Sequence, residues 1–377
     1  MKIGFIFNAQ SHQIFHSLPV ACALSCDYPE IQVTLFARNK TQSEFLRCLA
    51  GYYDANNLQY QIAAPPPPYS WMSTDAPAPK RLTLLWNLWK FLHFDALVTP
   101  ERTSISLRRM GLRSTKFIHT THGAGDDERD WDTRIRDFDL VLLPGAKRRD
   151  RLLEKGLLRH GHYYVSGYNK FDLVRRMETG RPPSFSNGRK TVLYNPHHNK
   201  HYSSWNKIGH KVLEYFAQSD QFNLIFAPHI RMLDDGILTK REFMPYKGME
   251  HILIDTGSER SVDMSYSLEA DIYLGDWSSQ VYEFLLHPRP VIFLNSHHHE
   301  WQGKEDYLWW TLGKVAENIS EMHAALTPDQ AWQSQYEAAQ KAAFNYTFAE
   351  AAQSAPERSA AAINIFLKHG RIEDDFV

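Results

Sequence analysis

The chain has 377 residues, of which 43% are hydrophobic and 23% are charged, a composition typical of a folded protein of about two domains. Its 42 Lys and Arg residues balance its 43 Asp and Glu residues, which argues against a protein that binds nucleic acid through a basic excess. Three cysteines, Cys22, Cys26 and Cys48, cannot form a disulfide framework, so reduced thiols in a cytoplasmic protein are expected.

The sequence shows no targeting or membrane-spanning segment. The apolar run at residues 2–7 is too short for a signal peptide and leads directly into polar residues. No stretch of about 18 apolar residues is present. We therefore expect a cytoplasmic protein, for which peripheral contact with the inner face of the cytoplasmic membrane stays open.

Short apolar runs recur along the chain, and most of them lack polar alternation, which indicates strands covered on both faces. The expected strands are 2–7, 31–36, 95–98, 116–119, 139–143, 162–165, 191–194, 223–226, 251–254, 271–274 and 290–294. Helices are expected between them, including 205–218 and 280–287, and again over 328–369. This alternation predicts an α/β fold with doubly wound parallel sheets.

A segment rich in Gly, Pro and Ser divides the chain and predicts a linker at 181–188. It separates an expected N-terminal domain (1–180) from an expected C-terminal domain (189–345). Residues 346–377 are expected to form a helix that returns to the N-terminal domain. Two Rossmann-like domains facing a cleft, with C-terminal helices crossing back, outline a GT-B-like architecture, which does not by itself fix function.

Residues 81–94 hold an unusual density of Leu, Trp and Phe. The first interpretation is a core helix of the N-terminal domain. The second is a helix that contacts lipid or a lipid-linked acceptor, because a Trp-rich segment beside Lys80 and Arg81 suits a membrane interface.

Polar side chains follow four expected strands of the second half of the chain. Ligands bind beyond the carboxyl ends of the strands in open α/β sheets, so these side chains predict a site for an anionic ligand. The candidate ligand- and phosphate-binding residues are Asn195, His197, Arg231, Gly275, Asp276, Ser278 and Ser279, and His229 is a candidate catalytic residue.

Each of these residues has a structural interpretation beside the functional one. Ser278 and Ser279 precede an expected helix, where hydroxyls and free N–H groups can hold a phosphate or simply cap the helix. His229 with Arg231 could bind a diphosphate as imidazolium and guanidinium, although a histidine after a strand is often structural. Asp276 would shape its turn or meet a hydroxyl of the ligand.

The first half of the chain offers one candidate general base. His122 follows the expected strand 116–119 in a Gly-containing loop, and Asp126 or Asp127 could orient its ring. The structural alternative is a tight turn with a hydrogen-bonded histidine.

Two histidine tracts, 197–201 and 297–299, raise the question of a metal site. Asn and Pro in the first tract favour a loop, no cysteine is near, and HExxH is absent, so no metal site is expected. The sequence also lacks G-x-G-x-x-G after the first strand, a P-loop and G-x-S-x-G. No cofactor is therefore expected.

Taken together, the loops resemble the CDP-glycerol glycerophosphotransferase family, the teichoic acid primases and polymerases. The similar elements are Thr121-His122-Gly123-Ala124, Gly167-Tyr168-Asn169-Lys170-Phe171-Asp172, Tyr194-Asn195-Pro196-His197, Pro228-His229, Gly275-Asp276-Trp277-Ser278-Ser279 and Arg289-Pro290-Val291-Ile292-Phe293. They cover 116–294 in the family's order. The resemblance implies a GT-B fold and transfer of a polyol phosphate from a CDP-activated donor to a hydroxyl of a cell-surface glycan or polyprenyl-linked acceptor.

Three departures from the family pattern keep other donors open. Ala124 and Gly275 stand where the family has Thr, and the turn at 195–198 is rich in His where the family has Thr and a basic residue. A GT-B glycosyltransferase that uses a UDP- or GDP-sugar is therefore an alternative, as is a UDP-sugar 2-epimerase. A third alternative, of another class, is a non-catalytic binding protein of envelope assembly.

Overall fold

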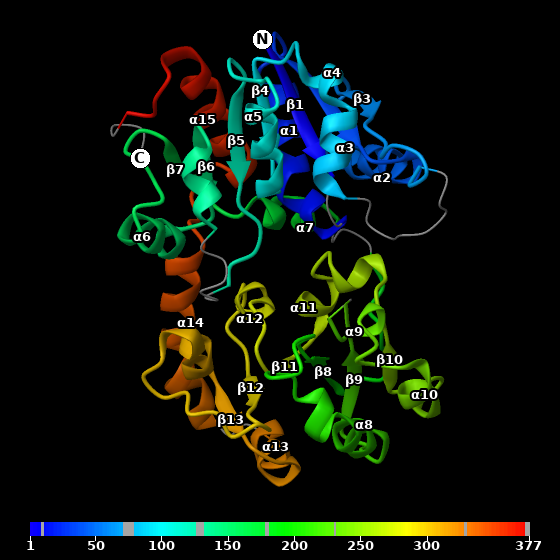
Figure 1. The fold of residues 1–377 in the computed structure, drawn as a ribbon. Coiled ribbons are helices and arrows are strands. Elements are labelled where there is room, and N and C mark those ends of the chain that lie inside the picture. Colours follow the sequence, from blue (N-terminus) through cyan, green and yellow to red (C-terminus); the bar gives the residue numbers. More distant parts are fainter. Residues whose placement is uncertain are drawn as a thin grey trace. The chain divides into compact units, whose positions relative to one another are not determined.

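The computed structural model describes residues 1–8, 11–70, 79–125, 132–177, 181–229, 231–327 and 330–373. The chain divides into two compact units. Unit 1 takes residues 1–122, 131–179 and 345–377, and unit 2 takes residues 123–130 and 180–344. Each unit is built around one parallel sheet (Figure 1).

Thirteen strands are found in the described part of the chain. Those of unit 1 are β1 (Lys2–Phe7), β2 (Gln32–Ala37), β3 (Gln59–Ile62), β4 (Ala96–Thr99), β5 (Lys116–Thr120), β6 (Leu140–Leu143) and β7 (Tyr163–Val165). Those of unit 2 are β8 (Lys190–Asn195), β9 (Phe222–Phe226), β10 (Ile252–Ile254), β11 (Ile272–Gly275), β12 (Val291–Leu294) and β13 (Lys314–Ala316).

The α-helices follow the strands in alternation. The first seven are α1 (Ile14–Asp27), α2 (Lys40–Ala50), α3 (Lys80–Trp86), α4 (Leu88–Phe91), α5 (Ser106–Arg109), α6 (Ala146–Glu154) and α7 (Asn169–Met177). The others are α8 (His210–Ala217), α9 (Arg231–Asp234), α10 (Lys240–Phe243), α11 (Ser265–Glu269), α12 (Gln280–Phe284), α13 (Ile319–Leu326), α14 (Gln330–Thr347) and α15 (Ala355–His369). None of these helices is long and apolar enough to cross a membrane.

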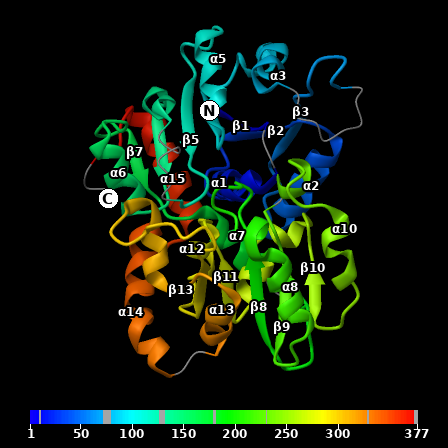
Figure 2. The ribbon, with the colours of Figure 1, turned by 60° about the horizontal axis from the view of Figure 1, so that its bottom comes forward.

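The sheet of unit 1 has the order β3-β2-β1-β4-β5-β6-β7, and every pair is parallel. This is a doubly wound order, in which the chain starts in the middle and reverses direction after β3. Buried side chains of α3, α4, α5 and α6 pack on one face around Leu84, Phe91 and Phe117. Helices α1, α2, α7 and α15 pack together on the sheet as well (Figure 2).

The chain returns to unit 1 at residue 345, and α15 then packs against α1 and α7. A glycine allows the close approach: a Cβ on Gly145 would lie 2.2 Å from the carbonyl oxygen of Thr347. The N–H of Ala349 donates to the carbonyl oxygen of Pro144 at 2.8 Å, which fixes the returning segment against the end of β6.

The sheet of unit 2 has the order β10-β9-β8-β11-β12-β13 and is also parallel. Its core on one face gathers side chains of α8, α10 and α13 around Tyr194, Phe216 and Phe226, all fully buried. Both units therefore repeat the same winding around a central first strand.

The expected α/β class with two doubly wound parallel sheets is confirmed. The structure adds two strands that the sequence pattern did not indicate, β3 and β13, which lie at the edges of the two sheets. The expected helix 205–218 begins as a π-helical turn, Trp205–Gly209, before α8. The segment 81–94 is divided at Asn87, whose side-chain amide donates to the carbonyl oxygens of Ala64 and Thr83.

Candidate active site

Four loops that follow β8, β9, β11 and β12 carry the sequence-predicted residues of unit 2. These strands are neighbours in the order β9-β8-β11-β12, and all run in the same direction. Their carboxyl ends therefore lie along one edge of the sheet, where ligands of open α/β sheets bind.

Three imidazoles are in contact at this edge. The ring centroid of His198 lies 4.3 Å from that of His197 and 4.3 Å from that of His229. The Nδ1 atoms of His197 and His229 each accept a backbone N–H, from Asn199 and Arg231, both at 3.2 Å. Accepting at Nδ1 assigns the proton of these two rings to Nε2, which is then a hydrogen-bond donor.

The charge of His229 differs from the sequence-based expectation. Burial, with His198 and Arg231 nearby, lowers the pKa of His229 to about 3. The ring is therefore neutral near pH 7, in contrast to the imidazolium expected from the sequence. It offers a neutral N–H, and Arg231, exposed at the start of α9, supplies the positive charge on this loop.

Asp276 is 1% exposed and holds the loops together. Its carboxylate accepts from the N–H groups of His197 (2.9 Å), Ser204 (2.6 Å) and Trp277 (2.7 Å) and from the Ser204 hydroxyl (2.8 Å). Burial raises the pKa of Asp276 to about 6, while these donors act in the opposite direction. The carboxylate is thus engaged within the protein and fixes the position of His197.

Asn195 and Gly275 also make internal contacts. The side chain of Asn195 is buried and donates to the carbonyl oxygen of Ala227 at 2.6 Å, which joins the loops after β8 and β9. A Cβ on Gly275 would lie 2.6 Å from the ring of Tyr273, so the packing of Tyr273 explains the glycine. Both residues thus shape the edge of the sheet at which His197, His198 and His229 lie.

Ser278 and Ser279 lie between β11 and α12 and are half-buried. The Ser278 hydroxyl accepts the N–H of Gln280 at 3.3 Å, whereas Ser279 precedes the helix without a side-chain cap. Helix α12 has five residues, so its dipole contributes little. Of the two hydroxyls, that of Ser279 makes no cap hydrogen bond to α12.

The second histidine tract supports the first loop. The Nε2 atom of His297 bonds the carbonyl oxygen of Ser203 at 2.9 Å, and that of His299 bonds the carbonyl oxygen of His201 at 2.9 Å. Since a carbonyl oxygen only accepts, both rings donate from Nε2. Among the described residues no group of three His, Cys, Asp or Glu side chains could hold a metal ion.

In unit 1, His122 stands directly after β5 and is half-buried. Its Nδ1 bonds the carbonyl oxygen of Pro100 at 2.8 Å, and its Nε2 lies 3.3 Å from the side-chain nitrogen of Gln13. Donation from Nδ1 to the carbonyl leaves the lone pair on Nε2, the atom that a general base requires. Asp126 and Asp127, expected to orient this ring, lie outside the described residues.

Sequence reasoning missed the neighbours of His122. The rings of His12 and His16 both lie 6.4 Å from it, and Tyr168 contacts His16 edge-on at 5.0 Å. Burial, followed by the charges of Lys170 and His122, holds the pKa of His16 well below its usual value. Their position in the sequence could have identified residues 12–16 as site neighbours. They follow β1, the central strand, and the first strand-to-helix loop of such folds borders the ligand site.

A sequence profile of the family described as CDP-glycerol:poly(glycerophosphate) glycerophosphotransferase matches residues 145–358, more than half of the chain. The chain belongs to this family. The match contains every strand-end residue of unit 2, whereas His122 lies before its first residue. A search of curated proteins found no match.

Solved structures of similar fold cover nearly the whole chain. The wall teichoic acid polymerase TagF aligns with a TM-score of 0.64 at 13% identity, over 98% of this chain and 89% of that one. A putative UDP-N-acetylglucosamine 2-epimerase from Listeria monocytogenes aligns with a TM-score of 0.69 at 15% identity, over 99% and 98%. Staphylococcus aureus MnaA in complex with UDP gives 0.65 at 13%, over 97% of both chains. At these identities the likeness shows the fold, and the expected GT-B class is confirmed.

Proposed function

We propose that this protein transfers glycerol phosphate, or a related polyol phosphate, from a CDP-activated donor to a hydroxyl of a cell-surface glycan or lipid-linked acceptor. Family membership supports this reaction class. The observation that carries the proposal is the group of three touching imidazoles beside Arg231 at the strand ends of unit 2. A lipid-linked acceptor would place the reaction at the inner face of the cytoplasmic membrane.

The donor's diphosphate would bind at this edge. His197 and His229 each present an Nε2–H, Arg231 presents a guanidinium, and the Ser279 hydroxyl adds a further donor. Fixed hydrogen-bond donors of this kind hold oxyanions and stabilise charge that develops on a leaving group. Here that group is CMP.

His122 would remove the acceptor's proton. As the acceptor oxygen bonds to the phosphorus that carries the polyol, its hydrogen passes to Nε2 of His122 and the bond from that phosphorus to the bridging oxygen breaks. The bridging oxygen leaves with CMP and takes the electron pair of the broken bond. The hydrogen bond from Nδ1 to Pro100 keeps the lone pair on Nε2 before the reaction and stabilises the imidazolium after it.

The test is nucleotide binding followed by turnover. Thermal unfolding would be measured with CDP-glycerol, CDP-ribitol, CMP, UDP-N-acetylglucosamine, UDP-glucose and GDP-mannose. A ligand at about 100 times its dissociation constant adds about 2.7 kcal/mol to stability. We expect stabilisation by cytidine nucleotides, reduced in His229→Ala and Arg231→Gln and retained in His287→Ala, an exposed histidine of unit 2.

The same panel separates the rival functions. One putative UDP-N-acetylglucosamine 2-epimerase shares the fold at a TM-score of 0.69, so stabilisation by uridine sugars alone would move the function to an epimerase or a sugar transferase. Release of CMP from CDP-glycerol only when an acceptor is present would support the polyol-phosphate transferase. Silence across the panel would contradict every nucleotide-dependent function and favour a binding protein of envelope assembly.

A further inference from the structure

The loop between β1 and α1 places an amide against the candidate base. Gln13 ends the 3-10 turn Ser11–Gln13 and is 6% exposed. Its Nε2 lies 3.3 Å from the Nε2 of His122. Because the Nδ1 of that ring donates to Pro100, the Gln13 amide donates to the lone pair on Nε2. Any hydroxyl that gives its proton to His122 must therefore take the place of this amide.

Buried contacts fix this arrangement. The hydroxyls of Ser17 and Thr120, both fully buried, share a hydrogen bond that joins α1 to β5. Gln13 directly precedes α1 and His122 closely follows β5, so this bond sets the two side chains opposite each other. The contact between the amide and the ring is therefore a fixed property of unit 1.

Half of the Gln13 amide is unused. Its Oε1 is buried and has no hydrogen-bond partner within the described residues. The Nδ1 of His16, about one helical turn further along the chain, is buried without a partner there too. Buried polar atoms normally find a partner, so two unpaired atoms beside the candidate base point to a polar ligand. Oε1 can only accept, and the group that pairs with it must therefore be a donor such as a hydroxyl.

We propose that Gln13 selects an acceptor in which the reacting hydroxyl has a second hydroxyl on the neighbouring carbon, an inference that rests on the proposed function. The reacting hydroxyl would take the place of the amide at His122, donating to Nε2 and accepting from the Gln13 N–H. The movement that takes this N–H off the ring also moves Oε1, to which the second hydroxyl would then donate. One amide thus binds two adjacent hydroxyls, and an alcohol with a single hydroxyl would leave Oε1 unpaired.

The charges around His122 decide how a change at Gln13 would act on the ring. The titratable and charged groups that face His122 or its neighbours are His12 before α1, His16 on α1, His119 on β5, Glu101 after β4 with Lys80 of α3, and Lys170 of α7, whose charge acts on His16. Burial holds the pKa values of His16 and His119 well below the usual value, so both rings are neutral near pH 7. Burial opposes the charge of Glu101, but Lys80 outweighs it and the pKa of Glu101 is lowered. Gln13 itself is uncharged, so a carboxylate introduced there would act on His122 directly.

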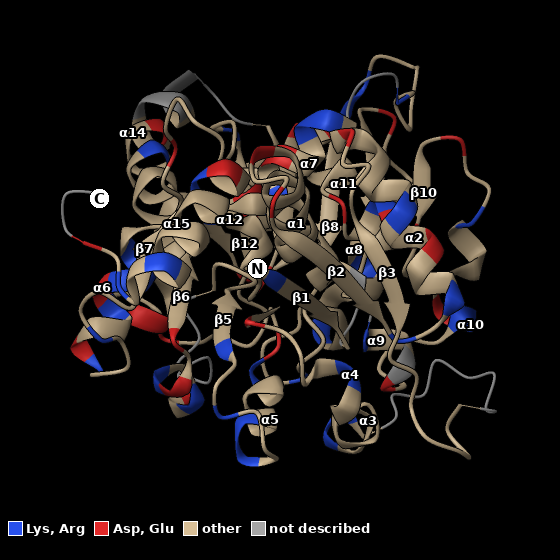
Figure 3. Ribbon diagram, turned by 90° about the horizontal axis from the view of Figure 1, so that it is seen from above, with Lys and Arg blue, Asp and Glu red and all other residues tan. Residues whose placement is uncertain are grey.

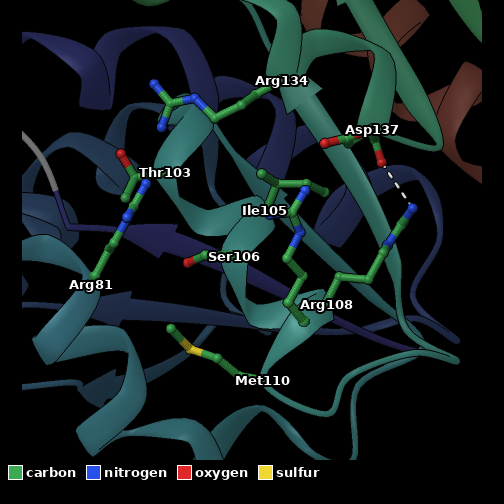
Figure 4. Close-up of a pocket in the computed structure, with 9 residues that line it drawn as sticks. Arg81, Thr103, Ile105, Ser106, Arg108, Met110, Arg134 and Asp137 are labelled. Carbon is green, nitrogen blue, oxygen red and sulfur yellow. Dashed lines mark hydrogen bonds between the residues drawn. The ribbon is translucent and has the colours of Figure 1, made fainter.

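A second opening of unit 1 supplies a matched control. Arg108 of α5, a helix whose arginines are blue in Figure 3, lines a pocket of about 390 Å³. Figure 4 shows Ser106 in this pocket, between Arg81 and Arg108. The Ser106 hydroxyl is also buried without a partner in the described chain, but neither Gln13 nor His122 lines the pocket. Ser106→Ala therefore removes an unpaired polar atom of unit 1 away from the candidate base.

The test follows the NMR signals of the His122 ring in the full-length protein, identified by their loss in His122→Ala. The probes are 1-O-methylglycerol, which carries two adjacent hydroxyls, and 3-methoxypropan-1-ol, which lacks the second one. We expect the first to bind with a dissociation constant about tenfold lower, since it makes one more hydrogen bond. Gln13→Leu should remove this difference, and Ser106→Ala should keep it. Equal dissociation constants in the unmodified protein, or unchanged His122 signals with both alcohols, would overturn the proposal.

Gln13→Glu covers the case in which Gln13→Leu does not fold, because it keeps the size of the side chain. A carboxylate in the place of the amide favours the charged ring and should raise the pKa of His122 by about one pH unit or more. Gln221→Glu, at an exposed position of unit 2, should leave that pKa unchanged. An unchanged titration of His122 in Gln13→Glu would contradict the contact on which the proposal stands.

Release of CMP from CDP-glycerol separates this inference from the proposed function. A preference for the diol at His122 without CMP release would support the role of Gln13 and contradict the transfer reaction. CMP release with equal KM values for the two alcohols would support the transfer and overturn the role of Gln13. We expect Gln13→Leu to raise the KM for 1-O-methylglycerol by about tenfold with kcat nearly unchanged, because the lost hydrogen bonds hold substrate and transition state alike.

Discussion

The two units wind their sheets in the same order, yet they present different chemistry at the carboxyl ends of their strands. In unit 1, His122 has Nδ1 occupied by a backbone carbonyl and its lone pair left on Nε2. In unit 2, His197 and His229 have Nδ1 occupied by backbone N–H groups, so Nε2 carries the proton. The backbone partner at Nδ1 alone makes one imidazole a proton acceptor and the others proton donors.

Removing the proton acceptor of unit 1 should have the largest effect of the changes considered, and the effect is on turnover. His122→Ala is expected to lower the turnover of CDP-glycerol by about 10²–10⁴-fold, the usual contribution of a general base. The dissociation constant of the donor should stay unchanged, because donor binding is assigned to unit 2. His93→Ala, an exposed histidine of unit 1, is the control. Near-full turnover in His122→Ala would show that the base is elsewhere.

The loops of unit 2 that carry the hydrogen-bond donors are held in place by one buried carboxylate, that of Asp276. Asp276→Ala should lower the free energy of unfolding by at least about 3 kcal/mol, since it leaves the N–H groups of His197, Ser204 and Trp277 without an acceptor. Chemical denaturation measures the loss, with the exposed Asp235→Ala as the control. A loss as small as that of Asp235→Ala would mean that other groups fix these loops.

The two units also differ in how their folds are completed. Unit 1 needs the returning segment 345–377, whereas unit 2 does not. Gly145→Ala should cost about 2 kcal/mol of stability, since its methyl group would overlap the backbone of Thr347. Gly51→Ala, where nothing lies within 4 Å, should be neutral or stabilising. Limited proteolysis near residue 347 should accelerate in the first variant, and unchanged protection would contradict the close approach.

The smallest expected effect is on pH dependence. Burial, followed by the charges of Arg102 and His122, holds the pKa of His119 well below 6.5. The native ring stays neutral while the unfolded chain takes up a proton, so stability is complete above about pH 6.5 and falls as the pH is lowered.

His119→Asn keeps a donor for the carbonyl oxygen of Thr99 and removes this titration. Between about pH 6 and pH 5 the unfolding free energy of the unmodified protein should fall by about 1 kcal/mol more per pH unit than that of His119→Asn. Denaturant titrations at several pH values measure the slope, and the exposed His93→Asn serves as reference. Parallel slopes for the unmodified protein and His119→Asn would contradict the assignment.

The interior strands could be predicted because burial on both faces leaves continuous apolar runs, as in Leu140–Leu143. The missed strands are edge strands with polar residues. Gln59–Ile62 is largely exposed, and Lys314–Ala316 has only three residues. An edge strand pairs on one side only, so its side chains need not be apolar and the sequence carries little signal.

The candidate site, like the fold, could be predicted only in part. The strand-end residues of unit 2 could be listed from the sequence, because parallel strands bring their carboxyl ends to one edge. The histidine tautomers could not be predicted from the sequence, because they depend on which backbone group each ring contacts. Pro100 and Gln13 reach His122 from 22 and 109 residues away. Such contacts exist only after the chain has folded.

The return of residues 345–377 to unit 1 has a consequence for synthesis. The chain is synthesised from its N-terminus, so every residue of unit 2 has been added before α15 exists. Unit 2 can therefore fold during translation, whereas unit 1 waits for the last segment to cover α1 and α7. The nascent N-terminal half is the species that most needs protection from aggregation, and a stop codon shortly before residue 345 would leave unit 2 able to fold beside an unfinished neighbour.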